Sequence, residues 1–282
     1  MAADTLVTTR QLAERLDDPD WIIFDCRFEL ASPDAGEQAY SEAHIPGACY
    51  VHLERDLSGP VGPRTGRHPL PDPDMLAAKL AGWGVGQHSQ IVTYDDRGGA
   101  FAARLWWLAR WLGHRNAAVL DGGLSRWRAE GRPLDRRIPQ PDPGRFNARV
   151  DHDLWLRTAD VEALVSGERD GRLLDARDRT RYTGEQEPVD SVAGHIPGAV
   201  NMPFKNNLGA DMTFRPPAEL AARFRNALEN EAPGQVVHAC GSGVTACHNV
   251  LAMEIAGLHG SRLYAGSFSE WIRTDHPVET GE

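Results

Sequence analysis

The fold can be read outward from one stretch of the sequence, VVHACGSGVTACH at residues 236–248. Its apolar start predicts a short strand, and the strand leads into a tight loop that begins with Cys240 and contains Gly241 and Gly243. Apolar residues then recur at helical spacing and predict an amphipathic helix. The members of this predicted core-facing stripe are Val244, Cys247, Leu251, Ile255 and Leu258. A strand, a loop and a helix in this order are typical of an α/β fold.

Cys240 is the candidate nucleophile of this stretch. It precedes a predicted helix, where unpaired backbone N–H groups and the helix dipole favour an anion, so its thiol should ionise more readily than an ordinary thiol. Gly241 and Gly243 are expected to permit backbone angles that direct several N–H groups at one sulfur. Ser242 and Thr245 add hydroxyl donors at the same rim. For an isolated cysteine the alternative is a small buried hydrophobe.

Composition narrows the class of protein. The chain has 282 residues and a formal net charge of −10, which predicts a soluble globular protein and disfavours a general surface for nucleic acid or anionic membrane. Four cysteines without a Cys-x-x-Cys pair do not suggest a disulfide framework. The N-terminal residues show neither a basic segment nor a long apolar run. We therefore expect a cytoplasmic protein that acts on small molecules or other proteins.

Internal repetition divides the chain into two halves. In the first half FDCR (24–27), AHIPGA (43–48) and DGGLSRW (121–127) correspond to LDAR (174–177), GHIPGA (194–199) and AGSFSEW (265–271) in the second. We predict domains at 1–138 and 151–282, joined by a proline-rich linker at 139–150. Strands alternate with helices in both halves, which predicts two α/β domains, each a mostly parallel sheet flanked by helices.

The loops of the two halves differ at the position of the candidate nucleophile. Aligning IVTYDDRGG (91–99) with VVHACGSGV (236–244) sets Cys240 opposite Asp95. An aspartate cannot serve as a thiol nucleophile, so only the C-terminal domain is expected to be catalytic. The N-terminal domain is then an interface partner or a lid, because clefts between domains commonly hold small molecules.

Together these motifs resemble the rhodanese-type sulfurtransferases, over nearly the whole chain. The loop CGSGVTA (240–246) is most similar to that of the 3-mercaptopyruvate branch. The resemblance implies tandem rhodanese-like domains and a double displacement: Cys240 takes a sulfane sulfur from an anionic donor as a persulfide and passes it to cyanide, a thiol or thioredoxin. It implies no metal and no organic cofactor. The anion cradle would be the loop that follows the cysteine: Gly241, Ser242, Gly243, Val244 and Thr245.

The resemblance also implies a basic site for the donor and a proton relay. Arg181 matches a donor-binding arginine, and Arg177 either shares this role or forms a structural ion pair. A second arginine usual in the mercaptopyruvate branch is missing, because Val189 and Asp190 stand there. Asp56 and His68 are the best matches for a relay with Ser242 that protonates the leaving group, although His68 could simply cap a turn.

Several alternatives remain at this stage. The donor could be thiosulfate, or the protein could be a non-enzymatic sulfur carrier or interaction module. A cysteine phosphatase is disfavoured because Ala246 stands where a Cys-x5-Arg motif needs its arginine. A zinc site formed by His238, Cys240, Cys247 and His248 has no recognised spacing. Cys247 is either a buried helix residue or a redox partner of Cys240.

Overall fold

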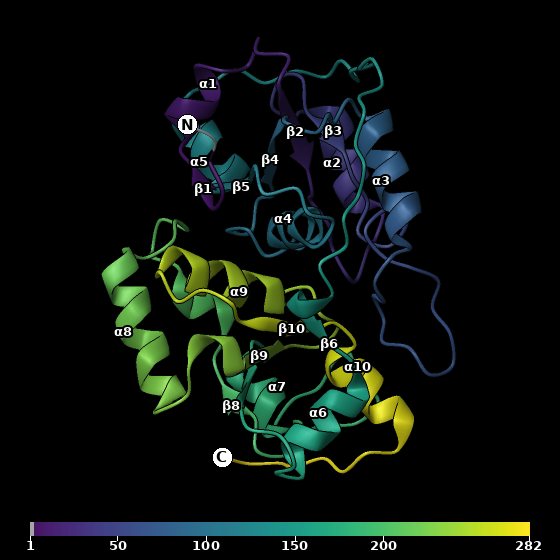
Figure 1. Ribbon diagram of the computed structural model, residues 1–282. Coiled ribbons are helices and arrows are strands. Elements are labelled where there is room, and N and C mark those ends of the chain that lie inside the picture. Colours follow the sequence, from purple (N-terminus) through teal and green to yellow (C-terminus); the bar gives the residue numbers. More distant parts are fainter. Residues whose placement is uncertain (1–2) are drawn as a thin grey trace. The chain divides into compact units, whose positions relative to one another are not determined.

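Two five-stranded sheets form the protein, one in each of two compact units (Figure 1). The computed structural model describes residues 3–282. All pairings between the named strands are parallel. The predicted class, an α/β fold with two parallel sheets flanked by helices, is therefore confirmed. Within residues 3–282, each helix falls short of the length and apolar character that a membrane crossing needs.

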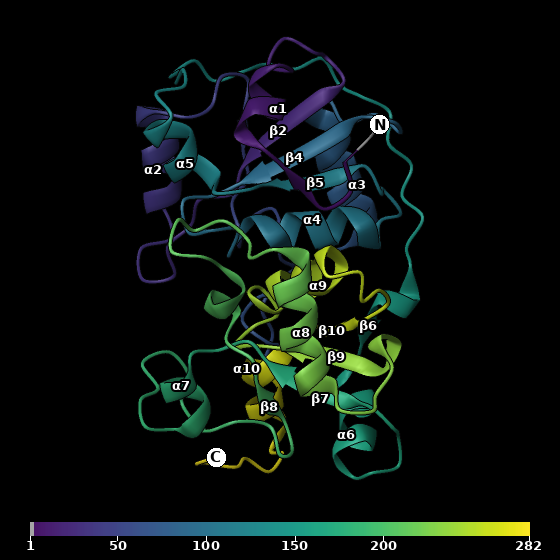
Figure 2. The same ribbon diagram turned by 90° about the vertical axis from the view of Figure 1, so that its left-hand side faces the viewer.

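The first unit has the strand order β1-β5-β4-β2-β3. Its strands are β1 (Leu6–Val7), β2 (Trp21–Asp25), β3 (Cys49–Tyr50), β4 (Gln90–Tyr94) and β5 (Ala117–Leu120). Its helices are α1 (Thr9–Ala13), α2 (Ala35–Glu42), α3 (Pro73–Gly82), α4 (Ala102–Trp111) and α5 (Gly123–Ala129). Figure 2 shows α4 running along one face of this sheet. The Thr8 side chain caps α1 by accepting a hydrogen bond from the backbone N–H of Gln11.

The second unit repeats this topology with the order β6-β10-β9-β7-β8. Its strands are β6 (Trp155–Leu156), β7 (Arg172–Asp175), β8 (Val200–Asn201), β9 (Val236–Ala239) and β10 (Arg262–Tyr264). Its α-helices are α6 (Thr158–Val165), α7 (Arg179–Thr183), α8 (Pro217–Leu228), α9 (Ala246–Ile255) and α10 (Ser267–Trp271). Short 3-10 helices occur at His152–Leu154, Phe204–Asn207, Pro233–Gln235 and Ile272–Thr274.

The helix after the cysteine loop, α9, is not amphipathic as predicted. Every residue from Ala246 to Met253 is buried, including the polar residues His248 and Asn249, whereas Ile255 of the predicted stripe is only partly buried. The polar residues are satisfied inside the unit, because Asn207 donates to Asn249 Oδ1 at 2.7 Å and Asn249 donates to the Met202 carbonyl at 2.8 Å. A helix buried on every side fixes the loop at its N-terminus more firmly than a surface helix would.

The two units exchange short segments of chain. Residues 60–70 follow the first part of the N-terminal half but belong to the second unit, and Gly209–Phe214 belong to the first unit. Hydrogen bonds fasten 60–70 to α10, because the Arg67 N–H donates to Ser269 Oγ at 3.0 Å and the Gly66 N–H to Glu270 Oε2 at 3.3 Å. In the first unit the Phe214 N–H donates to Asp121 Oδ1 at 2.9 Å. The boundaries 1–138, 139–150 and 151–282 stay a prediction.

Candidate active site

Cys240 lies directly after β9, at the carboxyl end of the central strand of the second sheet. Its backbone is held on both sides: the Cys240 N–H donates to Ser267 Oγ at 3.0 Å, and the Phe268 N–H donates to the Cys240 carbonyl at 3.0 Å. The residue is buried, with 2% of its surface exposed. The strand and α10 thus fix the candidate nucleophile in one place at the end of the sheet.

Ser267 helps to position the backbone of Cys240, a role that the sequence did not predict. It has a φ of 51°, in the left-handed region that a non-glycine residue rarely adopts. Gly123, its counterpart in the repeat, has a φ of 55°. The following residue, Leu124, donates its N–H to the Asp95 carbonyl at 2.8 Å, just as Phe268 does to Cys240. The alignment of the two halves already contained a sign of this role, because Ser267 stands where the first half has Gly123. The serine adds a hydroxyl that accepts the Cys240 N–H.

The two glycines of the loop have different roles, which corrects the prediction of special backbone angles for both. Gly243 has a φ of 74° and needs that freedom, whereas Gly241 does not lie in the left-handed region. A β-carbon built at Gly241 would lie 2.7 Å from Arg67 Nη2 and 3.6 Å from Arg181 Nη1. Gly241 therefore makes room for the guanidinium group of Arg67.

The loop amides do not converge on the sulfur as expected. None of the described residues, 3–282, forms a hydrogen bond with Cys240 Sγ. Val244 is buried in the loop, and Thr245 occupies the N-cap position of α9 without a side-chain capping bond.

The corresponding loop of the first unit shows what such a cradle can hold. The buried Asp95 carboxylate accepts four backbone hydrogen bonds: from Arg97 and Gly99 on Oδ1 at 2.8 and 2.9 Å, and from Phe101 and Ala102 on Oδ2 at 2.8 and 2.9 Å. Burial raises the pKa of Asp95, and the four N–H groups act in the opposite direction. In this loop, between a parallel strand and a helix, the backbone N–H groups thus point at the carboxylate oxygens of Asp95. Those oxygens are two bonds away from the β-carbon.

Arg181 lies on α7 in a cluster of charges beside this loop. Its Nε and Nη2 donate to Glu187, and Nη2 also donates to Asp190 Oδ2 at 2.9 Å. Burial acts to raise the pKa of Glu187, but the hydrogen bonds from Arg181 and from two backbone N–H groups outweigh it and lower that pKa. Arg181 is therefore held in a fixed orientation, with Nη1 and Nη2 both 3.6 Å from where a β-carbon of Gly241 would lie.

Arg67 is the second basic residue here, and the sequence did not single it out. It comes from the exchanged segment 60–70 and forms an ion pair with Asp190. Burial raises the pKa of Asp190, while its two arginine partners, Arg67 first, act to lower it. Asp190, which stands where the mercaptopyruvate branch usually has an arginine, thus forms ion pairs with both Arg67 and Arg181.

Arg177 has the geometry of a structural residue. It is buried and donates to the Asp175 carboxylate through Nε at 3.0 Å and Nη2 at 2.6 Å, and to the Gly194 carbonyl at 2.8 Å. Arg27 makes the same bonds to Asp25 and the Ala43 carbonyl in the first unit, where Asp95 stands at the position of Cys240. Since the arrangement recurs without the cysteine, it favours the structural ion pair over donor binding.

The structure brings Ser242 and His68 together. The Ser242 hydroxyl and His68 Nδ1 are 2.7 Å apart, and both residues are buried. His68 belongs to the same exchanged segment as Arg67. A serine and a histidine at this distance can pass a proton between them, with the direction set by the tautomer of the ring.

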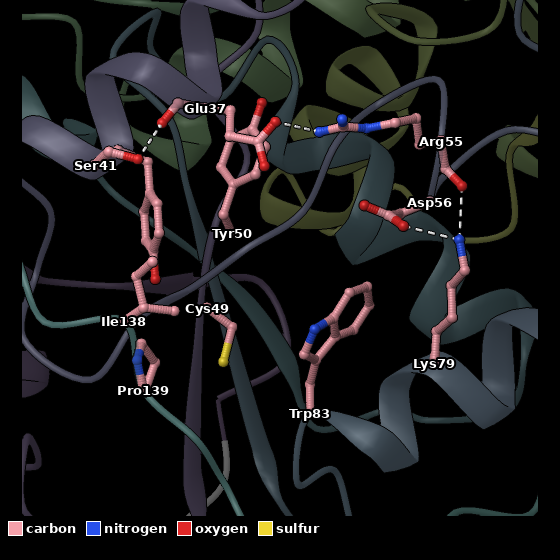
Figure 3. Close-up of a pocket in the computed structure, with 11 residues that line it drawn as sticks. Glu37, Ser41, Cys49, Tyr50, Arg55, Asp56, Lys79, Trp83, Ile138 and Pro139 are labelled. Atoms are coloured by element: carbon pink, nitrogen blue, oxygen red, sulfur yellow. Dashed lines mark hydrogen bonds and ion pairs between the residues drawn. The ribbon is translucent and has the colours of Figure 1, made fainter.

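Asp56, the third residue of the expected relay, lies in the first unit, in a pocket of about 460 Å³ (Figure 3). Its Oδ1 accepts a hydrogen bond from Lys79 Nζ at 2.8 Å, and its Oδ2 accepts the His52 N–H at 2.8 Å. Tyr40, Tyr50 and Trp83 also line this pocket. The bonds of Asp56 are thus made inside its own unit, and its part in a relay stays a prediction.

The residues considered for zinc or redox chemistry have other partners. His238 Nε2 lies 3.2 Å from Met253 Sδ, and burial lowers the pKa of His238 to about 3. Cys247 Sγ donates to the Gly243 carbonyl at 3.3 Å, and no disulfide joins it to Cys240. Within residues 3–282, no three side chains of the His, Cys, Asp or Glu type are arranged to hold a metal ion. Cys247 fits the structural alternative, since its thiol stabilises the turn that precedes α9.

Comparison with known proteins identifies the family to which the two halves of the chain are similar. The rhodanese-like domain family matches residues 8–130 and 158–274. A protein of Pseudomonas aeruginosa named "Probable 3-mercaptopyruvate sulfurtransferase" is 51% identical over 286 residues, covering 100% of both chains. Rat thiosulfate sulfurtransferase is 32% identical and covers 96% of this chain and 93% of its own. The structure of 3-mercaptopyruvate sulfurtransferase from Leishmania major superposes with a TM-score of 0.84 at 28% identity, over 95% of this chain and 74% of the other.

Proposed function

The chain belongs to the family of rhodanese-like domain proteins and is a sulfurtransferase, and from that premise we propose that Cys240 carries the transferred sulfur. The cysteine stands at the carboxyl end of a central parallel strand, where α/β proteins bind their ligands. The observation that carries the proposal is the position of two guanidinium groups against Gly241, the residue after the cysteine. An anionic sulfur donor is thereby attracted to the nucleophile.

The persulfide is expected to rest in the loop through its outer sulfur. In a cysteine persulfide the outer sulfur is two bonds from the β-carbon, as are the carboxylate oxygens of an aspartate. Asp95, at the equivalent position of the repeat, receives four backbone N–H groups on those oxygens. The loop from Gly241 to Thr245 would supply such donors once sulfur has been transferred, which agrees with the lack of any bond to Sγ among residues 3–282.

We propose 3-mercaptopyruvate as the donor. Its sulfur bonds to Cys240 Sγ as its own C–S bond breaks, and the electron pair of that bond leaves with pyruvate as an enolate. The enolate carbon must take up a proton, and the donor thiol loses one. The buried Ser242–His68 pair, 2.7 Å apart, is placed to move that proton. Asp56 is proposed as the third member of this relay, and Arg181 as the donor-binding residue.

Thiosulfate is the second candidate donor, because full-length relatives carry that name. Its transfer releases sulfite and needs no proton on carbon, so the Ser242–His68 pair favours mercaptopyruvate. For the acceptor we propose cyanide, a small thiol or a thioredoxin-like protein, and for the location the cytoplasm. We propose an N-terminal domain at 1–138, a linker at 139–150 and a catalytic domain at 151–282. The N-terminal domain would be non-catalytic.

The decisive experiment replaces Cys240 by serine. After incubation with 3-mercaptopyruvate, the parent should gain the mass of one sulfur on the peptide that contains Cys240, and it should turn over with cyanide. The Cys240→Ser variant should do neither while keeping its circular dichroism spectrum and melting temperature. Transfer that persists in this variant would reject the assignment, and a persulfide without turnover in the parent would indicate a sulfur carrier. The ratio of kcat/KM for the two donors then decides between mercaptopyruvate and thiosulfate.

A further inference from the structure

The pocket of about 460 Å³ in the first unit has walls that, apart from Asp56, take no part in the chemistry proposed for Cys240. Its lining residues come from α2, β3 and α3 and from the segments 55–56, 83 and 138–139, all of which belong to the first unit. Pockets of roughly 300–1,000 Å³ are typical of sites for small molecules. We propose that this pocket binds a free amino acid with an aromatic side chain, whose ammonium and carboxylate groups pair with charges at the rim. The proposal goes beyond sulfur transfer and does not depend on it.

Two tyrosines form an aromatic wall that is fixed in advance. The ring centroids of Tyr40 and Tyr50 lie 5.5 Å apart, at an interplanar angle of 36°. Each hydroxyl is already used inside the unit, because Tyr40 donates to the Ala48 carbonyl at 2.8 Å and Tyr50 donates to the Arg27 carbonyl at 3.1 Å. The rings are therefore held in place, and a ligand ring that packs on them orders little else.

Trp83 and Cys49 bring polar atoms to the same pocket. Figure 3 shows the Trp83 indole and the Cys49 thiol facing one space below Tyr50. Trp83 packs edge-to-face on Phe24 with the ring centroids 5.7 Å apart, yet its Nε1–H forms no hydrogen bond with any of residues 3–282. The buried Cys49 thiol has no hydrogen-bond partner in that range either. Burial raises the pKa of Cys49 to about 11, so near pH 7 this thiol is neutral and contacts a ligand without attacking it.

Two ion pairs stand at the rim of the pocket. Arg55 pairs with Glu37, and Lys79 Nζ lies 2.8 Å from Asp56 Oδ1. The side chains of the first pair are 53% and 48% exposed, and those of the second pair are also accessible to solvent. Ion pairs as exposed as these contribute little to stability, so their members can exchange partners with the charges of a ligand.

The balance of charge at the rim favours a zwitterion. Among the described residues that line the pocket, two are cationic and two are anionic, so a ligand with a single charge is repelled by two of them. An amino acid carries both charges on one carbon, and its carboxylate can pair with Arg55 while its ammonium pairs with Glu37. Its ring then lies against the tyrosine wall and covers Ile138, an apolar side chain that is 68% exposed.

The test combines calorimetric titration of the parent with protection of Cys49 against alkylation, using L-phenylalanine as the probe. Alkylation at pH 8, followed by mass spectrometry of the peptides, reports on Cys49 separately from Cys240 and so locates the ligand. L-Phenylalanine should bind and should slow the alkylation of Cys49 but not that of Cys240. Phenethylamine and 3-phenylpropionate, which carry only the ammonium or only the carboxylate, should each bind about fivefold more weakly.

Variants at the rim assign the two charged groups. Glu37→Gln should weaken the binding of L-phenylalanine and phenethylamine about fivefold and leave 3-phenylpropionate at least as tightly bound. Arg55→Gln should weaken L-phenylalanine and 3-phenylpropionate by a similar factor and spare phenethylamine. The matched control is Glu42→Gln, because Glu42 lies on the same helix as Glu37 and is exposed but does not line the pocket. This control should bind all three compounds as the parent does.

The proposal is overturned if L-phenylalanine binds no more tightly than its singly charged analogues, because a zwitterion is then not recognised. It is also overturned if L-phenylalanine binds to the parent without slowing the alkylation of Cys49, or if none of the three compounds binds at millimolar concentration. The comparison of ligands needs no variant, so it decides even if a substitution disturbs folding. Each of these results concerns the first unit and leaves the role of Cys240 as it stands.

Discussion

Replacing Ser242 by alanine should separate the two donors. The variant removes the hydroxyl that lies 2.7 Å from His68 Nδ1 in a buried setting. Transfer from 3-mercaptopyruvate moves a proton to carbon, whereas transfer from thiosulfate releases sulfite without any proton transfer to carbon. The loss of the hydroxyl should therefore slow the first reaction and largely spare the second.

The size of each effect follows from what the hydroxyl does. A positioned proton donor contributes about 10²- to 10⁴-fold to a rate, so kcat with mercaptopyruvate should fall by at least about 10²-fold. With thiosulfate only a neutral hydrogen bond near the loop is lost, worth about 0.5–1.5 kcal/mol, which limits the decrease to roughly tenfold. Folding stability should fall by about 1–3 kcal/mol, because His68 Nδ1 loses this buried partner.

The assay is steady-state turnover with cyanide, in which kcat and KM are measured for each donor in the parent and in Ser242→Ala. Thiosulfate serves as the control within the same variant, because it reports on any general damage to the loop. Urea unfolding gives the loss of stability separately. Equal decreases in kcat for both donors would refute the argument, since a group that handles a proton cannot matter equally to a reaction without one.

Two further predictions concern the loop and the core of the second unit. Gly243→Ala should destabilise the protein and abolish sulfur transfer, because Gly243 has a φ of 74° and a β-carbon there would overlap the Ala265 carbonyl. The control in urea unfolding is Gly257→Ala, since Gly257 has a φ of 71° with open space around it. This control should lose only about 1–2 kcal/mol of stability. If both variants lose equal stability, close packing at Gly243 is not the cause. Burial, and then the charge of Arg223, lower the pKa of His238 from 6.5 to about 3. His238 therefore stays neutral in the folded protein, whereas in the unfolded chain it takes up a proton below about pH 6.5. The free energy of unfolding consequently falls as the pH falls. From pH 7 to 5 the parent should lose about 2 kcal/mol more than His238→Leu, measured by urea unfolding at both pH values, and an identical loss in the two proteins would contradict this.

Much of the fold could be predicted because its signals are local. The strand, loop and helix around Cys240 are recorded in apolar runs and glycines within a few residues of one another, and the repeat supplies the same pattern twice. The helix after the loop was the exception. Its periodic apolar residues predicted one buried face, but His248 and Asn249 find partners inside the unit and every residue from Ala246 to Met253 is buried. Periodicity cannot show that polar residues will also be satisfied in the interior.

The site could be predicted only in part for a similar reason. Cys240 and Ser242 lie in one recognisable loop, whereas Arg181 and His68 were found through a resemblance. Arg67 lies next to His68 in the sequence, but nothing local shows that residues 60–70 join the second unit, since this depends on tertiary contacts with α10. The role of Gly241 was mistaken for the same reason: the guanidinium that needs its missing side chain comes from a distant part of the chain.

The reciprocal exchange of 60–70 and 209–214 makes this chain an intramolecular analogue of a domain-swapped dimer. A fragment starting at residue 151 would contain the nucleophile and its strand but lack both Arg67 and His68, and a fragment ending at 138 would leave Asp121 without the Phe214 amide. Neither half of the duplication is thus self-sufficient. The cysteine in the second half thus shares its unit with residues that only the first half of the chain supplies.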